Sequence, residues 1–336
     1  MKQIKLLLMT LIGIITIAAC SDKKAEKEPS LPSISGKAGE IAVVSTKSQW
    51  EAEPGTSIRT VLAQDCPYLP QKEPLYTLFN VPQSAFNKVF QVHRNLMYIS
   101  IDPTKDTIGM QVRKDIWARP QTMLTIFAPN EESAGKYIID NSEIIISIFE
   151  QAERDRVIRN SKRYEEKDLR DFINGRIGGS PYFPSGYALK KQTPTFMWIS
   201  YETSYTNQGI FIYRFPYKNA TQFTPKYIVE KRDEVLKENV PASGENSYMI
   251  TNPTIIPGFK WISYKGRDFA ELRSLWDTHN DFMGGPFVSH SFLNRDSTEV
   301  IVVEGFVYAP KYDKRNYLRQ VESIVYSFEW NNPVGK

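Results

Sequence analysis

Cysteine and histidine are scarce in this sequence, which contains two cysteines, Cys20 and Cys66, and three histidines among 336 residues. So few cysteines exclude the disulfide framework of small secreted domains. The histidines, His93, His279 and His290, lack the spacing of the helical pair that binds zinc in metalloproteases. No stretch carries a recognised catalytic or cofactor motif, so the sequence predicts no cofactor and no metal site.

An excess of one charge is also lacking. The chain has 42 Lys and Arg against 38 Asp and Glu, a formal net charge of +4. This balance gives no electrostatic reason to expect nucleic acid as a partner. Eighteen tyrosines, eighteen phenylalanines and six tryptophans are more informative, because aromatic residues favour β-strands and also suit binding surfaces.

No hydrophobic run is long enough to span a membrane as a helix. The longest, residues 6–17, has 12 residues, whereas a spanning helix needs roughly 20. Two lysines, Lys2 and Lys5, precede it, and small residues follow it at Ala18 and Ala19. This arrangement is typical of a secretory signal peptide, which we assign to residues 1–19.

The end of that segment, Ile17-Ala18-Ala19-Cys20, resembles the lipobox of bacterial lipoproteins. The resemblance implies cleavage before Cys20, attachment of three acyl chains to this cysteine, and a stable membrane anchor. It also implies a location in the cell envelope.

The residues after Cys20 bear on which membrane carries the anchor. Ser21 favours the outer membrane under the familiar Gram-negative sorting rule. Lys23 and Lys24 depart from the acidic signal that sends some Bacteroidota lipoproteins to the cell surface. The periplasmic and surface faces therefore both stay open.

The expected mature chain, residues 20–336, is long enough for two domains. Residues 20–40 are rich in charge, Pro, Ser and Gly and predict a flexible tether. Two domains then follow, at residues 41–165 and 166–330. Residues 150–171 are almost all charged, which suggests a solvated connector. Cys66 has no intrachain partner once Cys20 is lipidated; a buried inert thiol is the simplest interpretation, and a reactive thiol would need a nearby base.

Strands and helices alternate in the first of these domains. Asn130 followed by two glutamates predicts the start of a helix that continues, with breaks, towards Asn174. Alternation within residues 95–102 places Leu96 and Tyr98 on one face of a strand. The other expected elements are strands at residues 41–44, 75–79, 107–113 and 122–127, and a helix at 56–63.

The second half shows a similar pattern. Residues 300–308 are almost continuously apolar and predict a central strand buried on both sides. Asp313 is expected to cap a helix, and residues 325–330 to form a final strand. Further strands are expected at 195–201, 209–215 and 259–264, with a helix at 221–238. The predicted fold class is α+β, with two mixed domains of sheet plus helix.

Four stretches stand out in the mature chain, at residues 69–74, 93–96, 283–288 and 304–310, together with Lys314, Arg315 and Arg319. They resemble a family of Bacteroidota lipoproteins known only as a domain of unknown function. The resemblance spans essentially the whole mature chain and implies no activity. The second half also looks loosely like a PsbP/Mog1-type sandwich, which implies a fold only.

One segment concentrates polar and aromatic groups that could form a site. The simplest interpretation is a turn that uses Gly284 and Gly285 for backbone freedom. Binding of a non-metal ligand is the main alternative, followed by a divalent metal site or acid–base catalysis. The candidate residues are Trp276, Asp277, His279, Asp281 and His290.

Two weaker motifs are better explained by structure than by chemistry. Ser133 and Lys136 match the Ser-x-x-Lys of penicillin-binding enzymes, but the supporting Ser-Asp-Asn and Lys-Thr-Gly motifs are absent. Residues 175–179 could cradle a phosphate, yet they lack the Walker lysine and follow a helix. A helix C-cap is favoured there.

Together these patterns predict a membrane-anchored envelope lipoprotein that binds an envelope protein or a small ligand without catalysis. The alternative is an envelope hydrolase or transferase with a site near His279 and His290.

Overall fold

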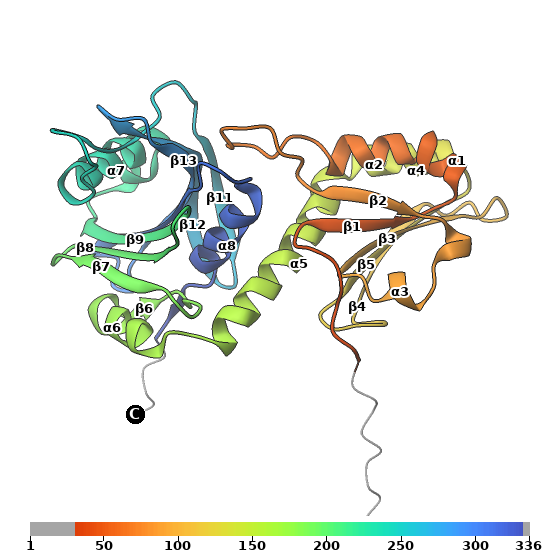
Figure 1. Ribbon diagram of the computed structural model, residues 1–336, viewed down its shortest axis with the longest axis horizontal. Helices are drawn as coiled ribbons and strands as arrows, with labels where there is room; N and C mark the ends of the chain where they lie inside the picture. Colours follow the sequence, from red (N-terminus) through yellow and green to blue (C-terminus); the bar gives the residue numbers. More distant parts are fainter. Residues whose placement is uncertain (1–30, 332–336) are drawn as a thin grey trace, which may run out of the picture.

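The computed structural model describes residues 31–331, and Figure 1 shows two domains connected by a long helix. Each domain combines a β-sheet with helices, so the predicted α+β class is confirmed. The predicted signal peptide, Cys20 and residues 21–30 lie outside the described residues. Bridges join Ser33 to Arg119 and Ser35 to His93, so the later part of the predicted tether lies against the N-terminal domain.

The N-terminal domain contains strands β1 (Glu40–Val44), β2 (Thr77–Val81), β3 (Asn95–Ile101), β4 (Gly109–Lys114) and β5 (Thr122–Ala128). They form one sheet in the order β2-β1-β3-β5-β4, in which only β4 runs antiparallel to its neighbour. The helices of this domain are α1 (Lys47–Glu51), α2 (Gly55–Leu62), α3 (Lys88–Gln91), α4 (Glu131–Asp140) and the first half of α5 (Ser142–Arg163).

Both faces of this sheet are covered. Met97 and Ile99 of β3 pack with α2, α4 and α5, whereas Leu96 and Tyr98 pack on the opposite face beside Phe90 of α3. The predicted alternation along β3 is therefore confirmed.

The boundaries of two elements follow from local hydrogen bonds. Asn130 caps α4 as predicted, because its side-chain oxygen accepts from the amide of Ser133 at 2.8 Å. The strand expected at residues 75–79 begins two residues later, at Thr77. The amides of Leu75 and Tyr76 instead donate to carbonyls at the end of α2.

The charged segment at residues 150–171 is solvated only in part: several residues from Arg159 onward are exposed, whereas residues before it are buried or half-buried. Most of it continues α5, whose Glu153 is 3% exposed and whose Arg156 is 9% exposed. Glu153 accepts hydrogen bonds from Arg94 at 2.8 Å and from Asn95 at 2.7 Å. Charged residues are buried here because each has a partner across the helix–sheet interface. Helix α6 (Lys167–Ile177) follows and ends at Gly178, whose φ of 73° forms the expected left-handed cap.

The C-terminal domain is an antiparallel sheet in the order β10-β12-β13-β14-β9-β8-β7, and β11 also pairs with β12. The strands are β7 (Ala188–Gln192), β8 (Phe196–Glu202), β9 (Asn207–Pro216), β10 (Tyr248–Thr251), β11 (Gly258–Tyr264), β12 (Arg267–His279), β13 (Gly284–Leu293) and β14 (Glu299–Tyr308). Central strand β14 is buried from Val300 to Val307, as its apolar sequence predicted.

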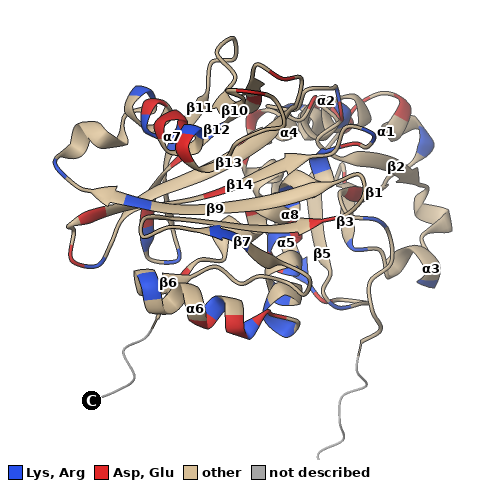
Figure 2. Ribbon diagram, turned by 60° about the vertical axis from the view of Figure 1, so that its left-hand side comes forward, with Lys and Arg blue, Asp and Glu red and all other residues tan. Residues whose placement is uncertain are grey.

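Two helices cover opposite faces of this sheet. Helix α7 (Pro225–Asn239) packs on one face, and α8 (Arg315–Tyr326) lies within the curve of the other (Figure 1). A Cβ atom on Gly305 of β14 would lie 2.9 Å from the Cβ of Val321 on α8. Glycine at this position therefore permits the close approach of helix and sheet. Figure 2 shows charges of both signs along α7 and α6.

Two expectations about the end of the chain are wrong. Asp313 does not cap α8; the carboxylate of Glu73, from the other domain, accepts from the amides of Lys314 at 2.6 Å and Arg315 at 2.9 Å. The final strand is only β15 (Glu329–Trp330), paired with β6 (Gly179–Ser180). Helix α8 continues to Tyr326 because its last turn is buried against the sheet.

Within residues 31–331, no helix is both long and apolar enough to cross a membrane.

Candidate functional site between the domains

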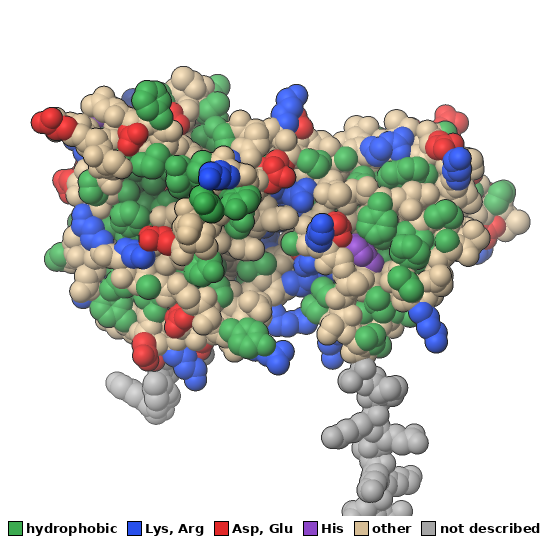
Figure 3. All heavy atoms as spheres, viewed as in Figure 1, with side chains coloured by type: hydrophobic (Ala, Val, Ile, Leu, Met, Phe, Trp, Pro, Cys, Tyr) green, Lys and Arg blue, Asp and Glu red, His purple; other side chains and the backbone are tan. Residues whose placement is uncertain are grey.

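A cavity of about 730 Å³ lies between the two domains. Its walls come from the loop that carries Cys66 and Tyr68, from α5, from β11 and β12, and from α8. Helices α5 and α8 lie side by side at this junction, and Figure 3 shows basic side chains gathered where the two domains meet. This volume falls within the range of about 300–1,000 Å³ typical of small-ligand sites.

A network of paired charges forms the floor of the cavity. Nε of Arg273 on β12 donates to Glu271 at 2.7 Å. Nη2 of the same guanidinium donates to Glu322 on α8 at 2.7 Å, and Arg154 on α5 donates to Glu322 at 2.9 Å. The three elements are thus held together by alternating charges, which fixes the shape of this wall.

A second pair ties α8 to the N-terminal domain. Arg319 donates to Glu150 of α5 at 2.6 Å and to the carbonyl of Leu75 at 2.7 Å. The hydroxyl of Tyr76 donates to the same carboxylate at 3.0 Å. The cavity is therefore bounded by charges whose positions depend on both domains.

The ionised form of the acidic partners is strongly favoured. Burial alone would raise the pKa of the Glu322 carboxyl, but the guanidinium groups of Arg273 and Arg154 more than offset it and hold the pKa at about 2. Burial likewise opposes ionisation of Glu271, whose pKa nevertheless lies well below its usual range because of Arg273 and His290. The floor therefore stays fully charged at neutral pH.

His290 supports this floor from behind. Its side chain is fully buried on β13, its Nε2 lies 3.1 Å from Glu271, and its ring stacks on Phe269 at 3.8 Å between centroids. The hydroxyl of Tyr326 donates to the same carboxylate at 2.8 Å. Burial lowers the pKa of the His290 imidazole from 6.5 to about 4, although Glu271 acts in the opposite direction.

Acid should destabilise the fold through His290. Between pH 6.5 and about 4 the unfolded chain holds a proton on this imidazole that the folded chain does not, so stability falls as the pH falls. A shift of this size corresponds to about 3 kcal/mol. Urea unfolding of the wild type and His290→Gln at pH 7, 5.5 and 4 measures the effect. The free energy of unfolding of the variant should depend less on pH than that of the wild type. An equal pH dependence in both proteins would contradict the role of His290.

Cys66 lines the cavity but is not activated. Its side chain is partly buried, and burial raises the pKa of the thiol to about 11, so the thiol is protonated at neutral pH. Of the two interpretations of Cys66 from the sequence, the raised pKa favours an inert thiol over a reactive one.

The candidate residues of the 276–290 segment are not brought together. Trp276 is buried and donates to the carbonyl of Val307 at 3.2 Å, beside a separate pocket of about 100 Å³. Asp277 accepts from Asn252 at 2.7 Å. These contacts stabilise the sheet.

The remaining candidates lie at the tip of the β12–β13 hairpin. His279 stacks on Tyr248 at 4.9 Å between centroids, and Asp281 accepts from the amide of Phe282 at 2.7 Å. The turn uses Asn280, with φ of 58°, whereas Gly284 and Gly285 belong to β13.

Histidines 279 and 290 do not share a site. His290 pairs across the sheet with Glu271, and His279 lies eight residues farther along the same strand. At about 3.3 Å per residue the separation is roughly 26 Å. Of the five candidates, only His290 contacts the interdomain network.

Sequence reasoning did not identify the charged residues around the cavity as a candidate site. Arg315, Arg319 and Glu322 occur at helical spacing on one face of α8, and Glu150 and Arg154 share a face of α5. This spacing was the available signal, but charges in such positions usually indicate a solvated face.

The remaining motifs have structural explanations. Ser133 hydrogen-bonds to Asn130 within the first turn of α4, and Lys136 pairs with Asp140 at 2.8 Å. Within residues 31–331, no cluster of three or more His, Cys, Asp or Glu could hold a metal ion.

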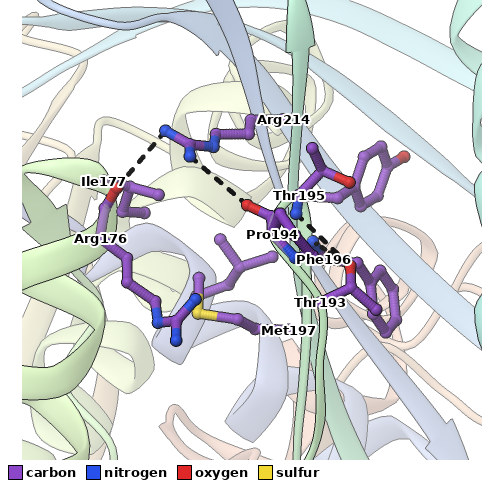
Figure 4. Close-up of a pocket in the computed structure, with 10 residues that line it drawn as sticks. Arg176, Ile177, Thr193, Pro194, Thr195, Phe196, Met197 and Arg214 are labelled. Carbon is purple, nitrogen blue, oxygen red and sulfur yellow. Dashed lines mark hydrogen bonds between the residues drawn. The ribbon is translucent and has the colours of Figure 1, made fainter.

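Figure 4 shows a much smaller pocket at the edge of the C-terminal sheet. Arg214 extends across it towards the carbonyls of Arg176 at 3.5 Å and Pro194 at 3.4 Å. Its volume is about 10 Å³, which is roughly the space of one water. It is therefore too small for an organic ligand.

Comparisons with known proteins find two family models that match separate parts of this chain, and neither describes an activity. Residues 34–162 match a family described as Domain of unknown function (DUF8532), and residues 167–327 match Domain of unknown function (DUF4837). The predicted resemblance to an uncharacterised family is thus confirmed at this level, with two families in place of one. No curated protein matches the sequence.

Similarity to solved structures is distant. A crystal structure from Bacteroides thetaiotaomicron VPI-5482 matches at 10% identity with a TM-score of 0.26, and the match covers 47% of each chain. A mutant of the protein Mog1 also matches at 10% identity and a TM-score of 0.26, over 46% of this chain and 92% of that one. The match therefore spans about half the length of the Bacteroides protein.

Proposed function

We propose that this protein is a lipid-anchored binding protein of the cell envelope, with the outer membrane favoured, and that it holds its ligand in the interdomain cavity without catalysis. The observation that carries the proposal is the cavity of about 730 Å³ whose floor is a network of paired charges. Such a floor can position a ligand because its side chains are already fixed by one another.

The anchoring part of the proposal rests on the sequence resemblance at Cys20. If it is correct, the wild type expressed in a Gram-negative host should incorporate labelled palmitate and sediment with membranes. Cys20→Ala should incorporate none. Equal labelling of the two proteins would contradict the anchor.

The binding part can be tested by obstructing the cavity. Ser147 of α5 lines it, so Ser147→Trp should place an indole ring in the cavity and block part of it without removing any ion pair. Ile144 is 53% exposed on the same helix and does not line the cavity, so Ile144→Trp is the matched control. The ligand should co-purify from envelope extract with the wild type and the control.

Native mass spectrometry would show whether a bound mass is present in each protein. We expect the occupied fraction of Ser147→Trp to fall at least tenfold. An equal bound mass in both variants would place binding elsewhere, and no bound mass in the wild type would contradict the proposal.

An enzyme with a site near both His279 and His290 has less support. The two side chains are roughly 26 Å apart, and His290 has no exposed surface with which to contact a substrate.

A further inference from the structure

Strand β11 presents an unpaired edge beside the cavity. It pairs only with β12, from Gly258 with Arg273 to Tyr264 with Arg267. The two residues of the connecting turn both have positive φ, 50° at Lys265 and 76° at Gly266, as a tight hairpin requires. In such a hairpin the closing pair is hydrogen-bonded, and hydrogen-bonded pairs then alternate along the strands.

This alternation directs three residues of β11 outward. The amides and carbonyls of Phe259, Trp261 and Ser263 point away from β12, and none of them has a hydrogen-bond partner among residues 31–331. A row of free donors and acceptors on a sheet edge is a template for another extended chain.

The side chains next to this edge differ between its two faces. Lys260 and Ile262 line the cavity, and Phe259 and Gly258 also border it. On the other face, Trp261 is 60% exposed and lies 5.4 Å from Phe223 and 6.3 Å from Phe259 between ring centroids. A strand added here would alternate its own side chains between a cavity and an aromatic surface.

Both ends of the edge are bounded by the N-terminal domain. Gly258 packs directly against Tyr68, and Tyr264 accepts a hydrogen bond from Gln151 of α5 at 3.0 Å. The open stretch, residues 259–263, measures roughly 16 Å at about 3.3 Å per residue. This length fits a segment of about five residues.

The charge of the cavity indicates which peptide segments would bind. Five basic residues line it against three glutamates, a surplus of two positive charges. Lys260 and Arg315 have no carboxylate partner among the described ion pairs. Acidic side chains on the cavity side of the added strand would therefore be favoured.

We infer that the ligand of the interdomain cavity is an extended, acidic peptide segment that adds as a strand to the free edge of β11. This inference rests on the proposed function and names its ligand class. The main-chain groups of residues 259, 261 and 263 supply hydrogen bonds, and every second side chain of the peptide enters the cavity.

The probe is a display library of random heptapeptides selected on the full chain purified in detergent, with counter-selection against Ser147→Trp. We expect enriched sequences with Asp or Glu at alternate positions. The most enriched peptide is then synthesised with a fluorescent label for anisotropy measurements. No enrichment over Ser147→Trp would overturn the inference.

A proline tests strand addition without disturbing the hairpin. The amide of Ser263 faces the free edge, so Ser263→Pro removes one outward donor and no bond to β12. It should weaken peptide binding at least tenfold, whereas Ser263→Ala should bind as the wild type does. Equal binding by both variants would overturn strand addition.

Two N-methylated peptides provide the reciprocal test. Methyl groups on the alternate amides that face β11 should abolish binding, and methyl groups on the other amides should not, because successive amides of a strand point to opposite sides. Equal binding of the two peptides would overturn strand addition.

Failure of this inference is distinguishable from failure of the proposed function. A non-peptide mass that is lost in Ser147→Trp would overturn the peptide while leaving cavity binding intact. Analytical ultracentrifugation would show whether the wild type forms a dimer. A dimer that is lost in Ser263→Pro would overturn the inference, because the edge of β11 would then bind a second copy of this chain.

Discussion

Replacing Arg232 by methionine should lower the free energy of unfolding by about 3–5 kcal/mol. Arg232 of α7 and Glu304 of β14 are both fully buried, with Nη2 2.8 Å from Oε1. The guanidinium also donates to Thr251 at 3.0 Å and lies 3.9 Å from the ring centroid of Phe287. Burial already raises the pKa of the Glu304 carboxyl, against the effect of Arg232, so the variant leaves an uncompensated charge in the core.

Urea unfolding measures this loss, and a double variant tests its cause. Arg232→Met with Glu304→Leu should recover most of the stability, because an apolar pair of similar volume replaces a buried ion pair at little cost. Lys231→Ala is the control on the same helix; it breaks a pair with Glu234, whose side chain is 62% exposed, and should cost less than about 1 kcal/mol. A double variant as unstable as the sum of the singles would contradict this account.

Glu322→Leu, at the domain interface, should lower the free energy of unfolding by a similar amount. Glu322 is 7% exposed and neutralises both Arg154 and Arg273. Without it, the guanidinium groups of Arg154 on α5 and Arg273 on β12 face each other with Glu271 as the remaining carboxylate, and the free energy of unfolding should fall by about 3–5 kcal/mol. Because these ion pairs join α5 to the C-terminal domain, we expect one urea transition for the wild type and two for the variant.

The control for this variant is another ion pair between α5 and the C-terminal domain. Glu329 pairs with Lys162 at 2.6 Å, but both side chains are more than 40% exposed. Glu329→Ala should therefore cost less than about 1 kcal/mol and leave one transition. If both variants lost the same free energy of unfolding, the burial of Glu322 would not explain its contribution to stability.

Elements with local signals could be predicted from the sequence. The apolar run of β14 identified a central strand, the alternation along β3 assigned its two faces, and Asn130 marked the start of α4. In each case the residues that carry the signal lie within a few positions of one another in sequence.

Elements that depend on distant partners could not be predicted. The cap of α8 comes from Glu73, 241 residues away from Lys314. Strand β12 was missed because it carries Glu271 and Arg273, which look solvated in sequence but are paired within the structure. The candidate site depends on the same kind of contact: Glu150 and Arg154 lay in a segment predicted to be solvated, Glu271 and Arg273 lay in one left unassigned, and Glu322 lay on a predicted helix with no sign of its partners.

The three-way contact of Glu322 with Arg154 and Arg273 also constrains how this protein can change over evolutionary time. Arg154 lies in the segment that matches one family, and the other two residues lie in the segment that matches the second. Loss of any one residue leaves an unbalanced buried charge, so single steps are disfavoured. Related chains should therefore inherit or lose the three residues together, and recombination that exchanges one half between distant relatives should succeed only where these charges match.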